Sequence, residues 1–407
     1  MKFVDICSGL GGFRVALENI VPDAECILSA DIKSDAIKTY NLNFNETNET
    51  TDLYDIKDLP PFDLLMAGFP CQPFSSAGQK KGFEDSRGGV IFKILDICQK
   101  SKPKYVVLEN VSNLITINQG ESLRRIVAEF RNIGYNVSYK KFNSADFGVP
   151  QVRERVFVVC HREREVDMEA VETRDPKVLG DVLEMDQQYT DLPQDFVKKI
   201  LDIHNKSSLH GYRVQDKRGG GKNIHSWDLD PDLTEGDKTL MNLIMTERRK
   251  KKWADEKGIP WMDGMPLTVQ EIKTFHDVPG LQGILDRLAE KKLLRLEKPK
   301  TLNDNGKRVY HEEGIPGYNI CKGKLSFPIS NILDPRGTSP TLTATDCNKL
   351  AVIGKGFMRK LTPREMARIS GFPDTYQLLP ECNNFDLFGN TVVPPVVEAV
   401  LRQTLDA

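Results

Sequence analysis

The alternation of short apolar runs with amphipathic stretches over residues 1–160 constrains the fold most. Runs such as KFVDIC and KYVVLENV predict buried strands, which we expect at 2–7, 25–31, 62–69, 104–111 and 155–160. Apolar residues at helical spacing predict helices between them, at 13–20, 34–42, 89–101 and 121–134. This order predicts an α/β fold, a parallel sheet with helices on both faces. Ligands of such sheets bind at the carboxyl ends of the strands.

Composition narrows the class of protein. The 407 residues are 39% hydrophobic and 28% charged, which predicts a folded chain with one large domain and a smaller one. No run approaches the roughly 20 apolar residues of a membrane span, and the first apolar run is too short for a signal peptide. The eight cysteines form no CxxC pair, so we expect reduced thiols and no metal site, in a cytoplasmic protein.

Charge gives a weaker indication. The net charge of −2 does not point to nucleic acid, although basic clusters such as 216–223, 247–253 and 290–300 would suit a local phosphate-binding face. A solvated helix surface is the alternative for each cluster.

Two features near the amino terminus predict a nucleoside-containing ligand. The glycine-rich turn SGLGGF, residues 8–13, follows the first strand, where glycines let the backbone approach a ligand. Asp31 ends the second strand, where a carboxylate can accept hydrogen bonds from ribose hydroxyls. The glycine spacing differs from GxGxxG, which argues against NAD. A turn that only connects a strand to a helix is the alternative.

A thiol and a carboxyl are predicted at the same edge of the sheet. Cys71 lies in the stiff loop GFPCQPFSSAG after the third strand, and Glu109 ends the fourth. A thiolate is a strong nucleophile, and a carboxylic acid in a dry site can hold or donate a proton. A packed structural cysteine and a helix-capping glutamate are the alternatives. Arg153 and Arg155, two residues apart in QVRER, would lie on one face of a strand and bind a phosphate, a base carbonyl or Glu109.

An ordered series of motifs resembles the DNA (cytosine-5)-methyltransferases of bacterial and phage restriction–modification type. The motifs are DICSGLGGF, GFPCQPFSSAG, GFEDSRGGVIF, ENV, GVPQVRERVFVV, RKLTPREMARISGFPD and LFGNTVVPPVV, which cover 1–160 and about 330–407. The resemblance implies a Rossmann-like methyltransferase domain that uses S-adenosyl-L-methionine, releases S-adenosyl-L-homocysteine and needs no metal. It also implies methyl transfer to C5 of a cytosine flipped out of double-stranded DNA.

The resemblance assigns roles residue by residue. Cys71 would attack C6 of the base, Glu109 would contact N3 and the amino group, and Arg153 and Arg155 would orient the base and the catalytic loop, residues 72–90. The cofactor-binding residues would be Ser8, Gly9, Leu10, Gly11, Gly12, Asp31, Ile32, Asp52, Leu53, Gly68, Phe69, Pro70, Val90, Asn390 and Thr391. DNA-binding residues would be Gln72, Ser75, Arg87, Gln151, Thr341 and Leu342. The family often has aromatic residues at the positions of Cys7 and Ile32, where they sandwich the adenine; Cys7 is expected only to line the cofactor site.

The middle of the chain carries target recognition in this family. We expect a catalytic domain at 1–165 and 345–407, with the last helix returning to the first sheet, and a recognition domain at 166–344. Within it, 266–314 predicts a winged helix: helices at 268–275 and 281–292, then strands at 293–299 and 307–313 around Asn305-Gly306. A small insert that only packs is the alternative. In the winged interpretation residues 281–292 would enter a groove, and Lys307 and Arg308 would touch phosphate, with Lys300 on the same side.

Three functions remain in competition. The first is a DNA cytosine-C5 methyltransferase in the bacterial cytoplasm or nucleoid, monomeric, not membrane-bound, with or without a cognate restriction endonuclease. A tRNA cytosine-C5 methyltransferase would share the catalytic motifs, but the long central region and GFPCQPFSSAG favour DNA. A non-catalytic DNA-binding regulator is disfavoured because Cys71, Glu109 and both arginines are intact.

Overall fold

The computed structural model describes residues 1–69, 89–186, 191–203, 209–216, 219–261, 264–321, 327–354 and 357–405. The chain divides into two compact units. Unit 1 comprises Met1–Gln187, Asp334–Asn348 and Leu361–Ala407, and unit 2 comprises Gln188–Leu333 and Lys349–Lys360. These boundaries differ from those expected from the sequence, because 166–187 and 334–344 group with unit 1 and 349–360 with unit 2.

A six-stranded sheet forms the centre of unit 1. Its strands are β1 (Lys2–Ile6), β2 (Glu25–Ala30), β3 (Leu64–Gly68), β4 (Tyr105–Val111), β5 (Asn136–Asn143) and β6 (Glu154–His161), in the order β2-β1-β3-β4-β6-β5. The first four strands are parallel, as predicted. β6 is antiparallel to both β4 and β5.

The expectation of a wholly parallel sheet is therefore wrong at β6, and β5 was not predicted. Residues 144–153 connect β5 to β6 without an α-helix. A parallel neighbour needs a crossover of about a dozen residues or more, so this short connection reverses the chain. β5 buries Val137 and Phe142 but exposes Tyr139, which leaves its apolar pattern weak.

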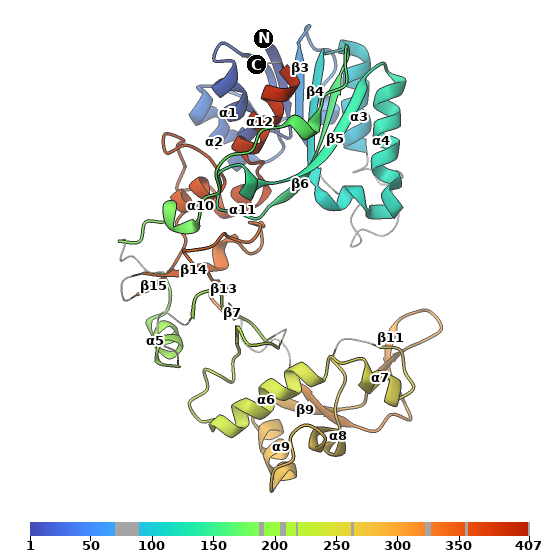
Figure 1. Cartoon of the computed structure of the whole chain (residues 1–407), viewed down its shortest axis with the longest axis vertical. Coiled ribbons are helices and arrows are strands. Elements are labelled where there is room, and N and C mark those ends of the chain that lie inside the picture. The colour runs from blue at the N-terminus through green and yellow to red at the C-terminus, as the bar shows by residue number, and fades with distance from the viewer. Residues whose placement is uncertain are drawn as a thin grey trace. The chain divides into compact units, whose positions relative to one another are not determined.

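Helices cover both faces of this sheet (Figure 1). Unit 1 contains the helices α1 (Gly12–Ile20), α2 (Ser34–Phe44), α3 (Gly89–Ser101), α4 (Glu121–Asn132), α10 (Pro363–Ile369), α11 (Asn384–Asn390) and α12 (Pro394–Leu405). One core packs α3 and α4 against side chains such as Val4 and Leu108. The opposite core packs α1 and α12 against side chains such as Phe3 and Val107, so the carboxyl-terminal helix completes the amino-terminal sheet as expected.

Unit 2 contains a five-stranded sheet and a helical part with their own cores. The sheet has the order β15-β14-β13-β7-β8. Its strands are β7 (Arg213–Val214), β8 (Asn223–Ile224), β13 (Asn331–Ile332), β14 (Leu350–Ile353) and β15 (Met358–Lys360), and α5 (Gln194–Ile203) precedes them. The helical part comprises α6 (Glu235–Glu247), α7 (Lys252–Glu256), α8 (Val269–Lys273) and α9 (Leu281–Glu290), then β9 (Leu294–Glu297), β10 (Lys300–Leu302), β11 (Arg308–Tyr310) and β12 (Gly317–Ile320). Buried side chains between Trp227 and Ile320 form its core.

The strands after α9 pair differently from the expectation. β9 pairs with β12, and β10 pairs with β11, both antiparallel. The Asn305-Gly306 turn therefore joins β10 to β11, and the strand expected at 293–299 ends at Glu297. A bridge between Leu267 and Tyr318 adds a further backbone partner to β12.

Candidate active site

The glycine-rich turn after β1 brings backbone amides to the carboxyl edge of the sheet. Gly11 has φ 70°, and a Cβ at that position would overlap the ring of Phe44. A Cβ on Gly12 would lie 2.7 Å from Val392 Cγ2, so the turn packs tightly on the segment before α12. Glycine is therefore required at this turn for its conformation and for close approach.

Asp31 is fixed where a ribose acceptor was predicted. Its Oδ2 accepts a hydrogen bond from the Gly9 amide at 2.9 Å, and its Oδ1 accepts one from the Lys33 amide at 2.8 Å. The Thr51 amide donates to the Asp31 carbonyl at 2.9 Å, which brings Asp52 to the same edge. Each carboxylate oxygen of Asp31 keeps acceptor capacity for a further donor.

A cavity of about 750 Å³ extends from Asp31 and Asp52, the predicted nucleoside-binding residues, to the carboxyl group of Glu109. The predicted residues that line it are Gly9, Asp31, Ile32, Asp52, Leu53, Gly68, Phe69, Val90, Glu109, Arg153, Arg155 and Asn390. A volume of this size is typical of small-molecule and cofactor sites. The structure thus brings together residues that lie up to 381 positions apart in the chain, from Gly9 to Asn390.

Several predicted residues lie behind the cavity or outside the described residues. Ser8, Leu10 and Thr391 are buried, and with Gly11 and Gly12 they are absent from the cavity wall. Leu10 offers its carbonyl to the Tyr376 hydroxyl at 2.6 Å, so its backbone helps to fix the turn. Pro70, Cys71, Gln72, Ser75 and Arg87 fall outside the described residues.

Glu109 forms a buried ion pair in the cavity. Arg155 Nε lies 3.0 Å from Glu109 Oε1, and both side chains are largely buried. Burial raises the pKa of Glu109, while Arg155 and Arg153 oppose that rise. A carboxyl in this environment holds a proton at higher pH than an exposed glutamate does.

Arg153 and Gln151 connect three segments of unit 1. Arg153 Nη1 donates to the Leu342 carbonyl at 2.9 Å, and Nη2 donates to the Thr391 carbonyl at 2.7 Å. Gln151 Nε2 donates to the Ile369 carbonyl at 3.1 Å, and its Oε1 accepts from the Leu342 amide at 3.2 Å. The pKa of Arg153 is lowered mainly by burial and, to a smaller extent, by the positive charge of Arg155.

These contacts correct the expectation for the DNA-binding residues in this part of the chain. Gln151 and Leu342 are each 1% exposed, so neither side chain can touch a nucleic acid in this conformation. The Thr341 hydroxyl donates to the Val152 carbonyl at 2.7 Å and is partly accessible. Gln151 and Leu342 hold the segment around residue 342 in place, and the Thr341 side chain is partly exposed to solvent.

Lys33, Tyr54, Leu387 and Gly389 line the cavity although the sequence did not point to them. Tyr54 is 50% exposed and directly follows the predicted Asp52-Leu53 pair, so its position next to that pair was the available signal. Cys7 lines the cavity as expected. Burial, with Asp31 nearby, raises the pKa of its thiol to about 12, so Cys7 stays neutral.

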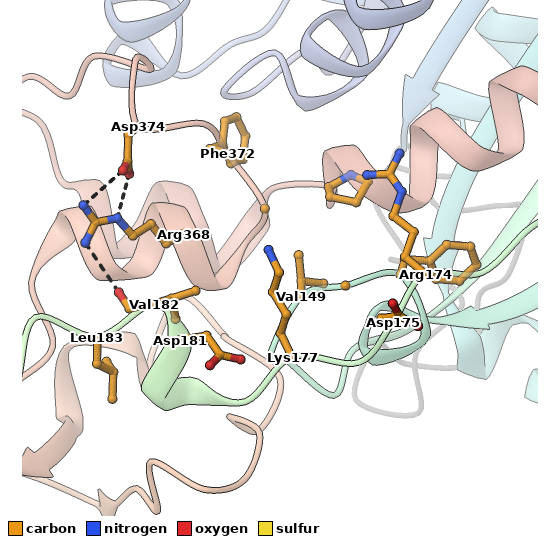
Figure 2. Close-up of a pocket in the computed structure, with 14 residues that line it drawn as sticks. Val149, Arg174, Asp175, Lys177, Asp181, Val182, Leu183, Arg368, Phe372 and Asp374 are labelled. Atoms are coloured by element: carbon orange, nitrogen blue, oxygen red, sulfur yellow. Dashed lines mark hydrogen bonds and ion pairs between the residues drawn. The ribbon is translucent and has the colours of Figure 1, made fainter.

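A second cavity, of about 660 Å³, contains none of the predicted site residues. Figure 2 shows Arg368 on its wall, held by Asp374 and by the carbonyl of Val182. Arg174, also on the wall, pairs with Glu398 at 2.8 Å. Because these arginines already have partners and acids such as Asp175 share the wall, charge there favours no particular ligand.

Metal-ligating clusters and membrane-spanning helices are both absent from the part of the chain that the structure describes. No group of three or more His, Cys, Asp or Glu side chains there is placed to hold a metal ion. None of the described helices combines the length and the apolar character that crossing a membrane requires.

Comparison with known proteins decides the family. The sequence pattern described as C-5 cytosine-specific DNA methylase matches residues 1–406. The chain belongs to this family. As a C-5 cytosine-specific DNA methylase, it catalyses methyl transfer to C5 of cytosine in DNA.

Relatives align over the whole length of this methylase. It is 42% identical to the type II methyltransferase M.NlaIV of Neisseria lactamica, over 100% of this chain and 99% of the relative. It is 34% identical to M.BanI of Aneurinibacillus aneurinilyticus, over 99% and 95% of the two chains. The crystal structure of S. pombe Dnmt2 methyltransferase matches with a TM-score of 0.56 at 16% identity, covering 100% and 98% of the chains, which supports the α/β methyltransferase fold.

Proposed function

We propose that this methylase is a type II restriction–modification enzyme that flips a cytosine out of a specific short duplex sequence. Cys71 would add to C6 of that base, and C5 would be methylated. The observation that carries the proposal is the single cavity in which Asp31 and Asp52 lie with Glu109 and Arg155. Flipping is needed because C6 and C5 are attacked from the faces of the ring, which neighbouring bases cover inside the stack.

The cavity suits S-adenosyl-L-methionine. Asp31 would accept hydrogen bonds from the ribose hydroxyls, and Asp52, whose Oδ1 also accepts from the Tyr54 amide at 3.0 Å, would accept one from the adenine amino group. Of the other predicted cofactor residues, seven line the same cavity: Gly9, Ile32, Leu53, Gly68, Phe69, Val90 and Asn390. When bound, this cofactor supplies a methyl group on a sulfonium centre and leaves as S-adenosyl-L-homocysteine.

The cysteine and the carboxyl would act together on the base. The Cys71 thiolate forms a bond to C6 while Glu109 holds a proton at N3, which makes C5 electron-rich. After methylation, loss of the C5 proton and of the thiolate restores the ring. Burial raises the pKa of Glu109, which favours the protonated acid that N3 requires. Arg155 would orient Glu109 and the base, while Arg153 would hold the neighbouring segments.

Recognition of the duplex is assigned to unit 2 and to the Thr341 segment, with Gln72, Ser75 and Arg87 contacting DNA near the target. Helices α8 and α9, followed by the paired strands β9 and β12, support the winged-helix interpretation. The bridge between Leu267 and Tyr318 places a third backbone segment beside β12. We also propose a monomeric, cytoplasmic protein that acts beside a cognate endonuclease.

Bisulfite sequencing tests this function. Plasmid DNA from cells that make the native protein should show one short motif whose cytosine resists conversion. DNA from cells that make Cys71→Ser should show none, because a serine hydroxyl is a far weaker nucleophile than a thiolate. Cys321→Ser, in unit 2, is the matched control and should retain the protected motif.

Full protection by Cys71→Ser would overturn the mechanism. If the native protein protects no DNA cytosine, sequencing of bisulfite-treated tRNA from the same cells tests the alternative substrate.

A further inference from the structure

We propose that the β10–β11 hairpin is the surface of unit 2 that contacts duplex DNA, and that helix α9 does not enter a groove. This inference rests on the proposed function, since it takes DNA as the partner of unit 2. It replaces the expectation that residues 281–292 read a groove. We define the wing as residues 300–310.

The wing is exposed and presents cations between apolar side chains. Residues 302–310 are all exposed. In the pairing of β10 with β11, Lys300 is opposite Tyr310 and Leu302 is opposite Arg308. Residues that are opposite each other, and those two apart, share a face of the ribbon. One face therefore carries two cations together with a tyrosine 53% exposed and a leucine 44% exposed.

The cations of the wing are available to a partner. Lys307 and Arg308 make no ion pair among the described residues, and Lys300 lies over the Tyr310 ring, 5.0 Å from its centroid. Tyr310 can thus stack on a sugar or base edge while the cations meet phosphates.

Several other basic residues of unit 2 are already engaged. In the cluster at 247–253, Arg248 is 1% exposed and donates to Asn319 Oδ1, while Lys250 pairs with Glu247. Lys257 pairs with Glu271. These contacts reduce the positive charge that this surface offers, so the wing is the better match for DNA.

Helix α9 has the wrong charge for a groove. Its exposed positions include Asp286 and Glu290, and the exposed Arg287 is paired with Asp237. Asp286 also accepts a hydrogen bond from the Tyr318 hydroxyl, which ties this face of the helix to β12. Carboxylates that face phosphates repel them, so this helix is better suited to support the wing.

The tip of the wing is preorganised. Asn303 Oδ1 accepts hydrogen bonds from the Lys307 amide at 2.8 Å and the Asn305 amide at 3.2 Å. Gly306 supplies the positive φ, 69°, that the turn needs. A two-stranded ribbon of this kind fits the major groove of DNA. Because the tip is fixed before binding, less conformational entropy is lost on association.

The test measures the salt dependence of binding to a mixed-sequence 30-base-pair duplex by fluorescence anisotropy. The variant Lys300→Gln/Lys307→Gln/Arg308→Gln should weaken binding more than tenfold at low salt. It should also reduce the slope of log K against log salt by about 2.7, because each phosphate that is no longer neutralised lowers the slope by about 0.9. The control Lys251→Gln/Lys273→Gln/Lys291→Gln removes the same charge from exposed positions of unit 2 and should change the slope little.

A second variant separates the wing from the helix. Gly283→Glu puts a negative charge on the exposed face of α9, where a new Cβ meets nothing within 4 Å. It should bind DNA like the native protein if the wing is the contact surface. Loss of binding by Gly283→Glu, or equal effects of the two triple variants, would overturn the proposal.

Lysine footprinting on the unmodified protein guards against misfolding of the variants. The duplex should protect Lys300 and Lys307 from acetylation and leave Lys251 reactive; equal reactivity with and without DNA would contradict the proposal. Neither measurement depends on methyl transfer, so both remain decisive whatever bisulfite sequencing finds.

Discussion

Asp5 is a fully buried carboxyl in the central sheet. It lies on β1, is 0% exposed, and neither carboxyl oxygen has a hydrogen-bond partner among the described residues. Burial raises its pKa to about 8, although Arg14 opposes that rise. Arg14 donates its hydrogen bonds to Glu18, Glu46 and Tyr40 instead. A carboxyl so placed makes the stability of unit 1 depend on pH.

The free energy of unfolding of Asp5→Asn, relative to that of the native protein, should be higher at pH 8 than at pH 5. The folded pKa, about 8, lies above the roughly 3.9 of an unfolded aspartate, so the native state binds more protons between these values. Native stability therefore falls as pH rises through this window, whereas asparagine removes that dependence. The relative gain should be on the order of 3 kcal/mol, measured by urea unfolding at both pH values.

Asp55→Asn, at an exposed carboxyl, is the control and should follow the native pH profile. Parallel profiles for the native protein and Asp5→Asn would contradict the buried, protonated state.

The sequence predicted the residues that line the cavity better than the buried residues that hold the surrounding segments in place. Asp31 and Glu109 were recognisable because each lies at the end of a predicted strand, whereas Asp52 was recognisable only through the family resemblance. The inward roles of Gln151 and Leu342 were not, because burial depends on the Ile369 and Thr391 segments packing there from the far end of the chain. Tyr54 was missed because a role was assigned to Asp52 and Leu53 but not to the residue that follows them.

Helix α11 packs very closely against the backbone of residues 343–344. A Cβ on Gly389 would overlap the backbone of Ala344 and Thr343. Backbone cannot move aside as a flexible side chain can, so α11 needs glycine at this contact. Because Gly389 also lines the cavity, this packing fixes one of its walls.

The substitution Gly389→Ala should therefore destabilise unit 1 by about 1–3 kcal/mol, the usual cost of overpacking. It should also weaken binding of S-adenosyl-L-homocysteine, which calorimetric titration would measure. Gly283→Ala is the matched control, since its new methyl group meets no neighbour. That control should gain about 0.5–1 kcal/mol from helix propensity. A neutral Gly389→Ala would mean that α11 can shift without cost.

Elements with strong local signals were predictable, but their pairing was not. Helix α3 matches its predicted range, 89–101, and the parallel strands agree to within two residues at each end. The direction of β6 depends on what connects it to β5, and β5 has only a weak apolar pattern. The turn at Asn305-Gly306 was found from local chemistry, whereas the pairing of β9 with β12 joins strands that lie on either side of the wing in the chain.

At the scale of the whole molecule, each described core cluster lies within one unit. Leu401 on α12 and Leu285 on α9 are both 0% exposed, in the cores of unit 1 and unit 2 respectively. Cores that share no residues should lose stability separately.

Calorimetric unfolding should thus show two transitions that respond to different substitutions. Leu401→Ala should lower the unit 1 transition, and Leu285→Ala the unit 2 transition, each by about 2–5 kcal/mol of unfolding free energy. Adding S-adenosyl-L-homocysteine should raise the unit 1 transition alone, because the candidate site lies there. A single transition that both substitutions lower equally would show one cooperative unit.

The return of α12 to the first sheet has a consequence for synthesis on the ribosome. The sheet side chains that α12 covers are translated long before residues 394–405 leave the exit tunnel. Until then the nascent chain presents an uncovered apolar face, which suits capture by a chaperone. The segments of unit 2 emerge before that face is closed. Since Asn390 on the cavity wall is also translated after all of unit 2, a chain that still lacks this residue has no finished site with which to mark the genome of its own cell.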